Sequence, residues 1–255
     1  MEKNQSTQSE KIVFTDVCKN FGKLEVLRNV SLTIRDKESH IILGQSGGGK
    51  SVLIKCLLGI LKLSSGDIRV DDLSVTNKEM YDEYLKKFSI LFQGNALFDS
   101  MTIMENVEFS AKQSGKNKKE CREIAEEKLQ AVGLNPRVFN LYPAEISGGM
   151  QKRAALARAI AIEPEVLLFD EPTSGLDPIT GGVICNLLKH TTQNLGITSI
   201  TITHDLKVAA FLGDRVSVLN GGQIVWTGLP FEMKNCSNEF VRNFYKASNT
   251  ISIAD

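Results

Sequence analysis

The octet GQSGGGKS at Gly44–Ser51 decides the fold of this chain. It satisfies the pattern G-x-x-x-x-G-K-[ST], and it lies between an apolar run at 40–43 and a helix-like run at 52–58. A strand, a phosphate-binding loop and a helix form the context that gives this pattern its meaning. We therefore predict that residues 44–51 hold phosphate groups.

Each residue type in the octet has a physical role. Glycines let the backbone curl so that several N–H groups converge on an anion. Lys50 adds a positive charge, and the helix that begins near Gly49 adds the positive end of its dipole. Ser51 supplies a hydroxyl oxygen for Mg²⁺, a hard ion that prefers oxygen ligands. The competing interpretation is a glycine-rich turn that binds nothing.

Length and composition limit the possible classes of protein. With 255 residues, 42% of them hydrophobic, the chain can bury the core of one large domain or two small ones. Its 30 basic and 30 acidic residues balance, so nothing attracts nucleic acid in general. The one obvious basic run, Lys112–Arg122, is typical of a solvated helix end.

The cysteines and the apolar runs indicate the compartment. Five cysteines are scattered without C-x-x-C spacing, which favours a reducing environment and argues against a zinc site. The opening MEKNQSTQSEK is polar, and no run of about 18 apolar residues follows. We expect a cytosolic protein unless a partner holds it at a membrane.

Periodicity predicts an α/β protein. Strand-like segments are expected at 12–14, 30–34, 40–43, 66–70, 166–169 and 197–203. A helix is expected over 120–132, with Gly133 at its end, and another over 152–162. We expect an α/β core, interrupted by a helical insertion and followed by a C-terminal extension after Gly228.

A second group of polar residues ends two of these strands. Asp170 and Glu171 follow the apolar strand at 166–169, and adjacent strand positions face opposite ways, so the two acids can serve different targets. Asp170 can approach magnesium while Glu171 holds the attacking water as a general base. The competing interpretation is a solvated strand end before Pro172.

His204 ends the strand at 197–203. A lone histidine there is more often a surface or core residue. Leu43, Asp170 and His204 nevertheless each mark the carboxyl end of an expected parallel strand, where open α/β sheets bind ligands. We therefore expect His204 to contact phosphate.

A second helix start can also bind an anion. Ser147 is a natural N-cap for the helix that follows, and Gly148 and Gly149 leave backbone N–H groups uncovered. Ordinary capping explains the same residues. If both helix starts bind phosphate, one chain carries two anion sites about 100 residues apart.

Together these motifs resemble the nucleotide-binding subunit of ATP-binding cassette (ABC) transporters, over residues 12–228. GQSGGGKS resembles the family's phosphate loop, Gln93 its glutamine switch and ISGGMQ its signature sequence. VLLFDE resembles its magnesium and base segment, the SGLD at Ser174–Asp177 its interface-crossing loop, and His204 its switch histidine. Phe21 falls where the family stacks an aromatic ring on adenine; a core Phe is the alternative.

The resemblance implies a RecA-like phosphate-loop core with an antiparallel β subdomain (1–92 and 150–228), a helical subdomain (about 93–149) and an extension (229–255). ATP and Mg²⁺ are the implied cofactors. The implied catalytic residues are Glu171, His204, Lys50 and Gln93, and the implied magnesium ligands are Ser51, Gln93 and Asp170. The implied nucleotide-binding residues are Phe21, Gly44, Gln45, Ser46, Gly47, Gly48, Gly49, Lys50, Ser51, Val52, Ser147, Gly148, Gly149 and Asp177.

The resemblance also implies partners. Two copies would clamp ATP head to tail, with the phosphate loop of one opposite Ser147–Gly149 of the other, and would drive an integral-membrane permease from the cytoplasmic face of the inner membrane. No nucleic acid is expected.

A finer resemblance, to the ATPases of MCE-linked, Mla-type phospholipid transport systems, rests on residues 91–109, 144–161 and 170–184 and on the tail at 239–244. It implies an MCE-domain lipid-binding partner and a role in outer-membrane lipid asymmetry. Two positions depart from the usual signature: Ile146 stands for Leu and Met150 for Gln. Met150 lacks a polar group that could reach the opposing ribose, although Met there is itself a feature of the lipid group.

Two alternatives remain. The chain resembles, in parts of the same stretches, importer ATPases for amino acids or other small solutes. A more distant alternative is a cassette ATPase that acts on DNA or ribosomes; such proteins usually join two cassettes or insert long coiled coils, and this chain has neither.

Overall fold

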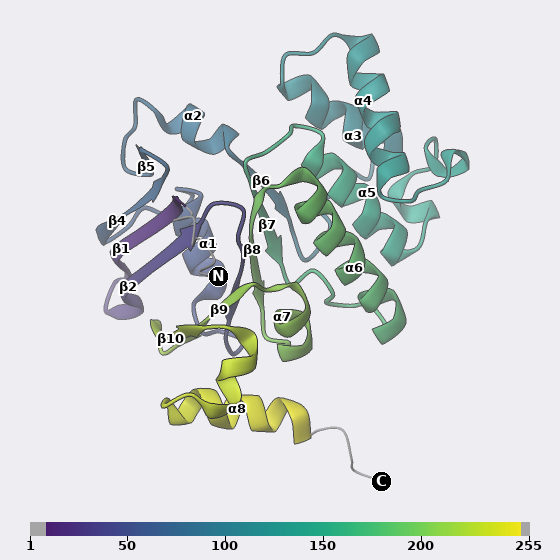
Figure 1. The fold of residues 1–255 in the computed structure, drawn as a ribbon. Helices are drawn as coiled ribbons and strands as arrows, with labels where there is room; N and C mark the ends of the chain where they lie inside the picture. Colours follow the sequence, from purple (N-terminus) through teal and green to yellow (C-terminus); the bar gives the residue numbers. More distant parts are fainter. Residues whose placement is uncertain (1–8, 251–255) are drawn as a thin grey trace, which may run out of the picture. The chain divides into compact units, whose positions relative to one another are not determined.

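The computed structural model describes residues 9–250, without the side chains of the last two, and divides the chain into two compact units. Unit 1 comprises Met1–Lys86 and Ile197–Asp255, and unit 2 comprises Lys87–Gly196. Figure 1 shows the elements of both units along the chain. The subdomain boundaries expected at residues 93 and 149 remain a prediction.

The first sheet of unit 1 is antiparallel and has the strand order β2-β1-β4-β5. Its strands are β1 (Glu10–Phe21), β2 (Leu24–Arg35), β4 (Ser65–Val70) and β5 (Leu73–Ser74). β1 and β2 form a hairpin around Gly22 and are longer than the expected strands because bulges near Asp16 and Asn29, both at positive φ, let pairing continue. The side chains of Ile12, Phe14 and Val17 on β1 are buried.

The second group of strands in unit 1 surrounds the strand before the phosphate loop. β3 (Ser39–Leu43) pairs in parallel with β8 (Thr198–Thr203) on one side and β9 (Arg215–Asn220) on the other, while β10 (Gln223–Gly228) pairs antiparallel to β9. Every residue of β8 is buried, as expected for a strand covered on both faces. The expected strands at 40–43 and 197–203 are confirmed.

The remaining elements of unit 1 are helices. They are α1 (Lys50–Leu57), α2 (Tyr81–Lys86), α7 (Leu206–Leu212), the 3₁₀ segment η3 (Pro230–Asn235) and α8 (Glu239–Thr250). α8 packs on η3, so the residues after Gly228 that the structure describes are folded (Figure 1).

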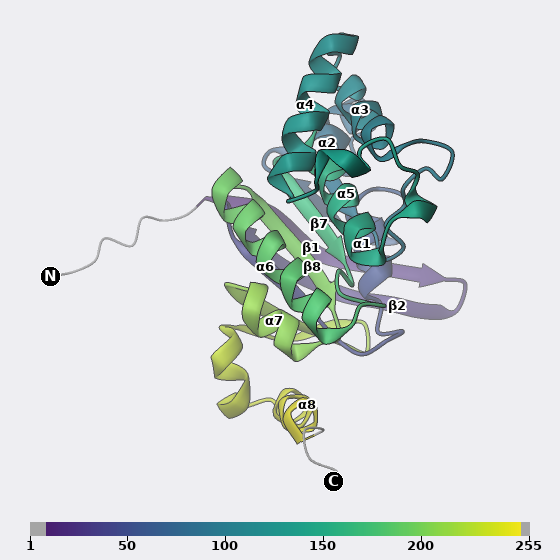
Figure 2. The same cartoon turned by 90° about the vertical axis from the view of Figure 1, so that its right-hand side faces the viewer.

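Unit 2 pairs two parallel strands, β6 (Phe88–Leu91) and β7 (Val166–Asp170), with four helices. Three of the helices, α3 (Ile103–Gln113), α4 (Lys118–Ala131) and α5 (Gly148–Ile160), pack together (Figure 2). The fourth is α6 (Pro178–Leu195), and two short 3₁₀ segments are η1 (Pro136–Val138) and η2 (Pro143–Glu145).

Local sequence explains the helix ends in unit 2. Thr102 with Glu105 and Asn117 with Glu120 form capping boxes at the starts of α3 and α4. Gly133 follows the end of α4 at φ 73, as expected for a glycine just past a helix. The basic run at 112–122 covers the end of α3, the link and the start of α4, and all of its residues except Cys121 are exposed, which confirms its interpretation as a solvated helix end.

Among the described residues, no helix is both long and apolar enough to cross a bilayer.

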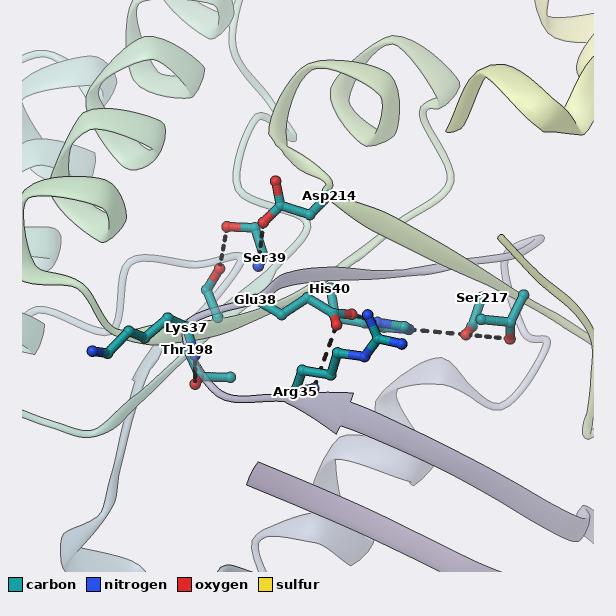
Figure 3. A network of polar contacts seen from close by, with 10 residues as sticks. Arg35, Lys37, Glu38, Ser39, His40, Thr198, Asp214 and Ser217 are labelled. Carbon is teal, nitrogen blue, oxygen red and sulfur yellow. Dashed lines mark hydrogen bonds and ion pairs between the residues drawn. The ribbon is translucent and has the colours of Figure 1, made fainter. Parts of the chain in front are cut away.

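A buried polar network fixes the start of β3 in unit 1 (Figure 3). His40, with none of its surface exposed, lies 2.6 Å from the Glu38 carboxylate through Nδ1 and 2.9 Å from the Ser217 hydroxyl through Nε2. Ser217 in turn contacts the Thr227 hydroxyl at 2.7 Å. Residues 40–43 are therefore not uniformly apolar: this run opens with His40, whose two ring nitrogens both have partners.

We expect His40→Ala to lower the free energy of unfolding by about 3 kcal/mol, because the buried Glu38 carboxylate loses its main partner. Urea denaturation followed by circular dichroism measures the change. Glu25→Ala is the control, since that carboxylate is 59% exposed and pairs only with Arg28 at the surface. Equal losses for both variants would contradict the importance of the network.

Candidate nucleotide site

The phosphate loop in unit 1 links β3 to α1 and keeps the helix start open. Gly49 is the N-cap of α1 at φ 99, and no side chain caps the helix. The backbone N–H groups of the first turn are therefore available to an anion, and the helix dipole favours one. A Cβ on Gly44 would lie 2.5 Å from the Leu219 carbonyl oxygen of β9, so this position requires glycine.

Lys50 lies along this loop. Its Nζ donates to the carbonyls of Gly44 at 2.8 Å and Gln45 at 3.0 Å, and the residue is 7% exposed. The ammonium group is thus held among the loop's carbonyls, from which it can turn to a phosphate oxygen.

Two further expected nucleotide-site residues belong to unit 1. Thr203 at the end of β8 aligns with Leu43, and the Gly44 N–H donates to the Thr203 carbonyl at 3.3 Å. The exposed His204, the next residue, therefore leaves the sheet at the same edge as the phosphate loop. Phe21 ends β1 and is 46% exposed, so it is not a core residue.

In unit 2, the carboxylates at the end of β7 differ in backbone geometry. Asp170 is the last residue of the strand, but Glu171 lies beyond it at φ 45. The prediction that the side chains of Asp170 and Glu171 alternate along one strand is therefore wrong for Glu171, because the chain has already turned. A non-glycine residue at such φ costs about 1–3 kcal/mol and is found preferentially at functional sites.

Gln93 connects two other segments of unit 2. Its side-chain Nε2 donates to the Ser174 hydroxyl at 3.0 Å, and its backbone carbonyl accepts from Lys152 Nζ at 2.6 Å. Ser174 begins the SGLD segment, and Lys152 belongs to α5. The glutamine switch, the SGLD segment and the signature helix are thus joined through one residue.

The signature segment also packs directly on the start of α6. Ser147 caps α5 by accepting from the Met150 N–H at 3.4 Å, which confirms it as the N-cap. A Cβ on Gly149 would lie 2.8 Å from Thr180 Cγ2, near the start of α6. Asp177 caps α6, accepting from the N–H groups of Ile179 and Thr180 at 3.0 Å each, and its hydrogen bonds with Thr180 lower its pKa.

Two site features were missed by the sequence analysis. α6 was not foreseen, so the capping role of Asp177 was not expected. Lys152, 3% exposed, was not singled out, although a lysine within the alanine-rich run of α5 is a recognisable signal. Burial lowers the pKa of Lys152, and the Asp170 carboxylate offsets part of that effect.

The expected magnesium ligands are chemically consistent. Ser51 offers a hydroxyl, Gln93 an amide carbonyl and Asp170 a carboxylate, all oxygen donors of the kind that Mg²⁺ prefers. Ser51 belongs to unit 1, and the other two belong to unit 2.

An uncapped glycine-rich loop after a parallel strand, an acidic pair after another, and a second glycine-rich helix start define a nucleotide-binding protein of the ATP-binding cassette class. The family model described as "ABC transporter" matches residues 27–174. The chain therefore belongs to the ABC transporter family: it binds ATP with Mg²⁺ and hydrolyses it, coupled to transport, as a subunit that dimerises and works with a membrane permease.

Curated relatives include the glutamine transport ATP-binding protein GlnQ of Escherichia coli, 37% identical over 86% of this chain and 91% of that protein. The methionine import ATP-binding protein MetN of Rhizobium johnstonii is 39% identical over 88% of this chain and 63% of that protein. The Fe(3+) ions import ATP-binding protein FbpC 1 of Rhizobium meliloti is 37% identical over 94% of this chain and 67% of that protein. The chain spans about two thirds of the length of these last two.

Solved structures agree on the fold. The ATP-binding cassette MJ0796, a dimer bound to ADP and Pi, has a TM-score of 0.77 and 31% identity, covering 86% of this chain and 98% of that chain. CbiO1 from Clostridium perfringens, part of the transporter complex cbiONQ, has a TM-score of 0.83 and 28% identity, covering 96% of this chain and 100% of that chain. The chain has the ABC nucleotide-binding domain fold, as the resemblance implied.

We expect Gly149→Ala to lower the free energy of unfolding by about 1–3 kcal/mol, because the new methyl overlaps the stiff, β-branched Thr180 side chain. Adding Thr180→Ser, which removes that methyl and keeps the hydroxyl, should recover most of the loss. Urea unfolding curves of both variants and of Thr180→Ser alone measure the effect.

Gly182→Ala is the matched control, because a Cβ at that helical position meets nothing within 4 Å. It should be neutral or stabilising by up to about 1 kcal/mol. A Gly149→Ala variant that behaves like Gly182→Ala would contradict the close packing of the signature helix against α6.

Proposed function

We propose that two copies of this chain close on ATP and that the closing motion drives a permease at the cytoplasmic face of the inner membrane. The observation that carries the proposal is the pair of glycine-rich helix starts: α1 with no side-chain cap, and α5 with an exposed Ser147. In a head-to-tail pair, the start of α1 in one copy and the start of α5 in the other contact the same nucleotide.

In this proposal each residue acts on a defined part of ATP. Lys50 and the N–H groups of the first turn of α1 hold the β- and γ-phosphates. Phe21 offers its exposed ring to the base, Ser147 contacts the γ-phosphate from the opposite copy, and His204 contacts it from the same copy. Glu171 orients water and takes its proton. Mg²⁺, held by Ser51, Gln93 and Asp170, neutralises phosphate charge.

The permease contact is proposed on the segment that follows Gln93. Phe92, Phe98 and Phe109 are each about 40% exposed, and the Phe98 and Phe109 rings meet edge to face at 5.0 Å. Such an exposed apolar surface is typical of a protein–protein contact. Because it lies beside Gln93, a permease bound there would respond when ATP binds or is hydrolysed. Asn106 is buried; its side chain accepts from the Phe98 N–H and donates to the Phe98 carbonyl, and so shapes the segment from inside.

For cargo, the relatives favour the importer alternative over phospholipid. Their names include import or transport of iron ions, methionine and glutamine, and the relatives described above include no lipid transporter. We therefore propose a small-solute importer as the better supported assignment. These relatives are each 37–39% identical to this chain and carry different cargo names, so the names support a solute importer without identifying the solute.

Phospholipid transport with an MCE-domain partner remains the second candidate. It is favoured by the segments 91–109, 144–161 and 170–184 and by Met150 in the signature. Under this candidate the chain serves outer-membrane lipid asymmetry. Action on DNA or ribosomes is disfavoured by the balanced charge.

Purification of the tagged chain from its own membranes in mild detergent, with mass spectrometry of proteins and lipids, separates these candidates. A solute permease with a binding protein is the expected result. An MCE-domain protein with bound phospholipid would overturn the importer assignment in favour of lipid transport. Ribosomal or DNA-repair partners would contradict both.

We expect Glu171→Gln to reduce ATP hydrolysis about a hundredfold or more, because the base is lost while the binding groups remain. The variant should accumulate as an ATP-bound dimer. Phosphate release and light scattering after size-exclusion chromatography measure the two effects.

Glu123→Gln, on the exposed face of α4, is the control and should hydrolyse ATP normally. Undiminished hydrolysis by Glu171→Gln would remove Glu171 from the role of base.

A further inference from the structure

We propose that Lys152 is a positioning residue: it fixes the backbone of Gln93 to the signature helix and so sets where the Gln93 amide can reach magnesium. The inference deepens the proposed function, since it rests on Gln93 as a magnesium ligand. Every contact that carries it lies within unit 2.

The geometry is that of a clamp on two consecutive carbonyls. Lys152 lies five positions after Ser147, in α5, and is 3% exposed. Its Nζ donates to the Gln93 carbonyl at 2.6 Å and to the Phe92 carbonyl at 3.4 Å. The first is a short, charge-assisted hydrogen bond, which is about twice as strong as a neutral one.

Packing alone does not explain a lysine here. Its neighbours Ala154, Ala155 and Ala157 are buried, and an ammonium group taken from water carries a desolvation penalty that an apolar side chain of similar length avoids. Burial lowers the pKa of Lys152, and the Asp170 carboxylate offsets only part of that effect. A lysine therefore supplies a directional hydrogen-bond donor to the Gln93 carbonyl, and this donor carries the desolvation penalty that an apolar side chain would avoid.

The loop that carries Gln93 needs such a support. Asn95 and Ala96 both have positive φ, at 60 and 52, a backbone conformation that is unfavourable for residues with a Cβ. A second side chain of α5, Arg158, donates to the carbonyls of Ala96 at 2.6 Å and Asn95 at 3.4 Å. Helix α5 thus holds the loop at both ends, through Lys152 beside Gln93 and through Arg158 further along.

The clamp acts on the backbone and leaves the Gln93 side chain free to change partners. That side chain donates to the Ser174 hydroxyl at 3.0 Å. Its amide can leave Ser174 for magnesium without breaking the Lys152 contact. Ser147 is the N-cap of α5, and Lys152 lies in the same helix. If nucleotide displaces the signature segment, Lys152 therefore moves the backbone of Gln93 with it.

The test compares Lys152→Met, which keeps length but loses the donor, with Lys152→Arg, which keeps it. In hydrogen-exchange mass spectrometry of the full chain, the peptide 92–98 contains the Asn95 and Ala96 amides, which bond to the Phe92 and Gly94 carbonyls. We expect exchange of this peptide to rise about tenfold in Lys152→Met and to return toward the parent in Lys152→Arg.

Metal binding gives the second readout. Mn²⁺ titration of the protein with a non-hydrolysable ATP analogue, followed by electron paramagnetic resonance, should show affinity about tenfold lower in Lys152→Met. Affinity for the same analogue in EDTA should stay unchanged. Lys119→Met, on exposed α4, is the matched control and should change neither value.

Unchanged exchange of peptide 92–98 in Lys152→Met would overturn the proposal, and so would equal losses of metal and nucleotide affinity, which indicate general damage. If Lys152→Met fails to fold, Lys152→Ala, which also lacks the donor and matches the neighbouring alanines of α5, takes its place under the same criteria. Gln93→Ala tests the underlying assignment: if it leaves Mn²⁺ affinity intact, Gln93 is not a ligand, while the exchange result still decides whether Lys152 holds the loop.

Discussion

The structure of the site depends on one backbone constraint: α1 must begin without a side-chain cap, so that its first N–H groups can bind phosphate. Gly49 at φ 99 supplies the turn, and Gly44 leaves room for the Leu219 carbonyl of the neighbouring strand. The parallel pairing of β3 with β8 then brings His204 out at the same edge. A phosphate site of this kind is built mainly from main-chain geometry, so its glycines carry as much chemistry as its lysine.

Sequence reasoning recovered what is local. The phosphate loop, the buried strands around it and the Ser147 cap could be predicted because each follows from a short pattern of adjacent residues. It misplaced Glu171, because the alternation of side chains holds only while the strand continues and here the chain turns at that residue. Cargo lies beyond this reasoning, because the motifs describe the nucleotide site and not the transported molecule.

What the sequence did not reveal depends on long-range contacts. His40 occupies a position that periodicity assigns to the core, and only the approach of Ser217, 177 residues later, shows how its second nitrogen is satisfied. Lys152 meets the Gln93 carbonyl across 59 residues. A polar residue within an apolar run is a signal that such a partner exists, but the run itself does not say which residue it is.

The contact between Gly149 and Thr180 also has an evolutionary consequence. Because a methyl at position 149 would press on the Thr180 side chain, these two positions share one fixed volume. Among descendants of this chain, a larger residue at one position becomes tolerable only after a smaller one has appeared at the other. The signature segment and the start of α6 therefore drift as a pair, and the order in which their changes can accumulate is constrained.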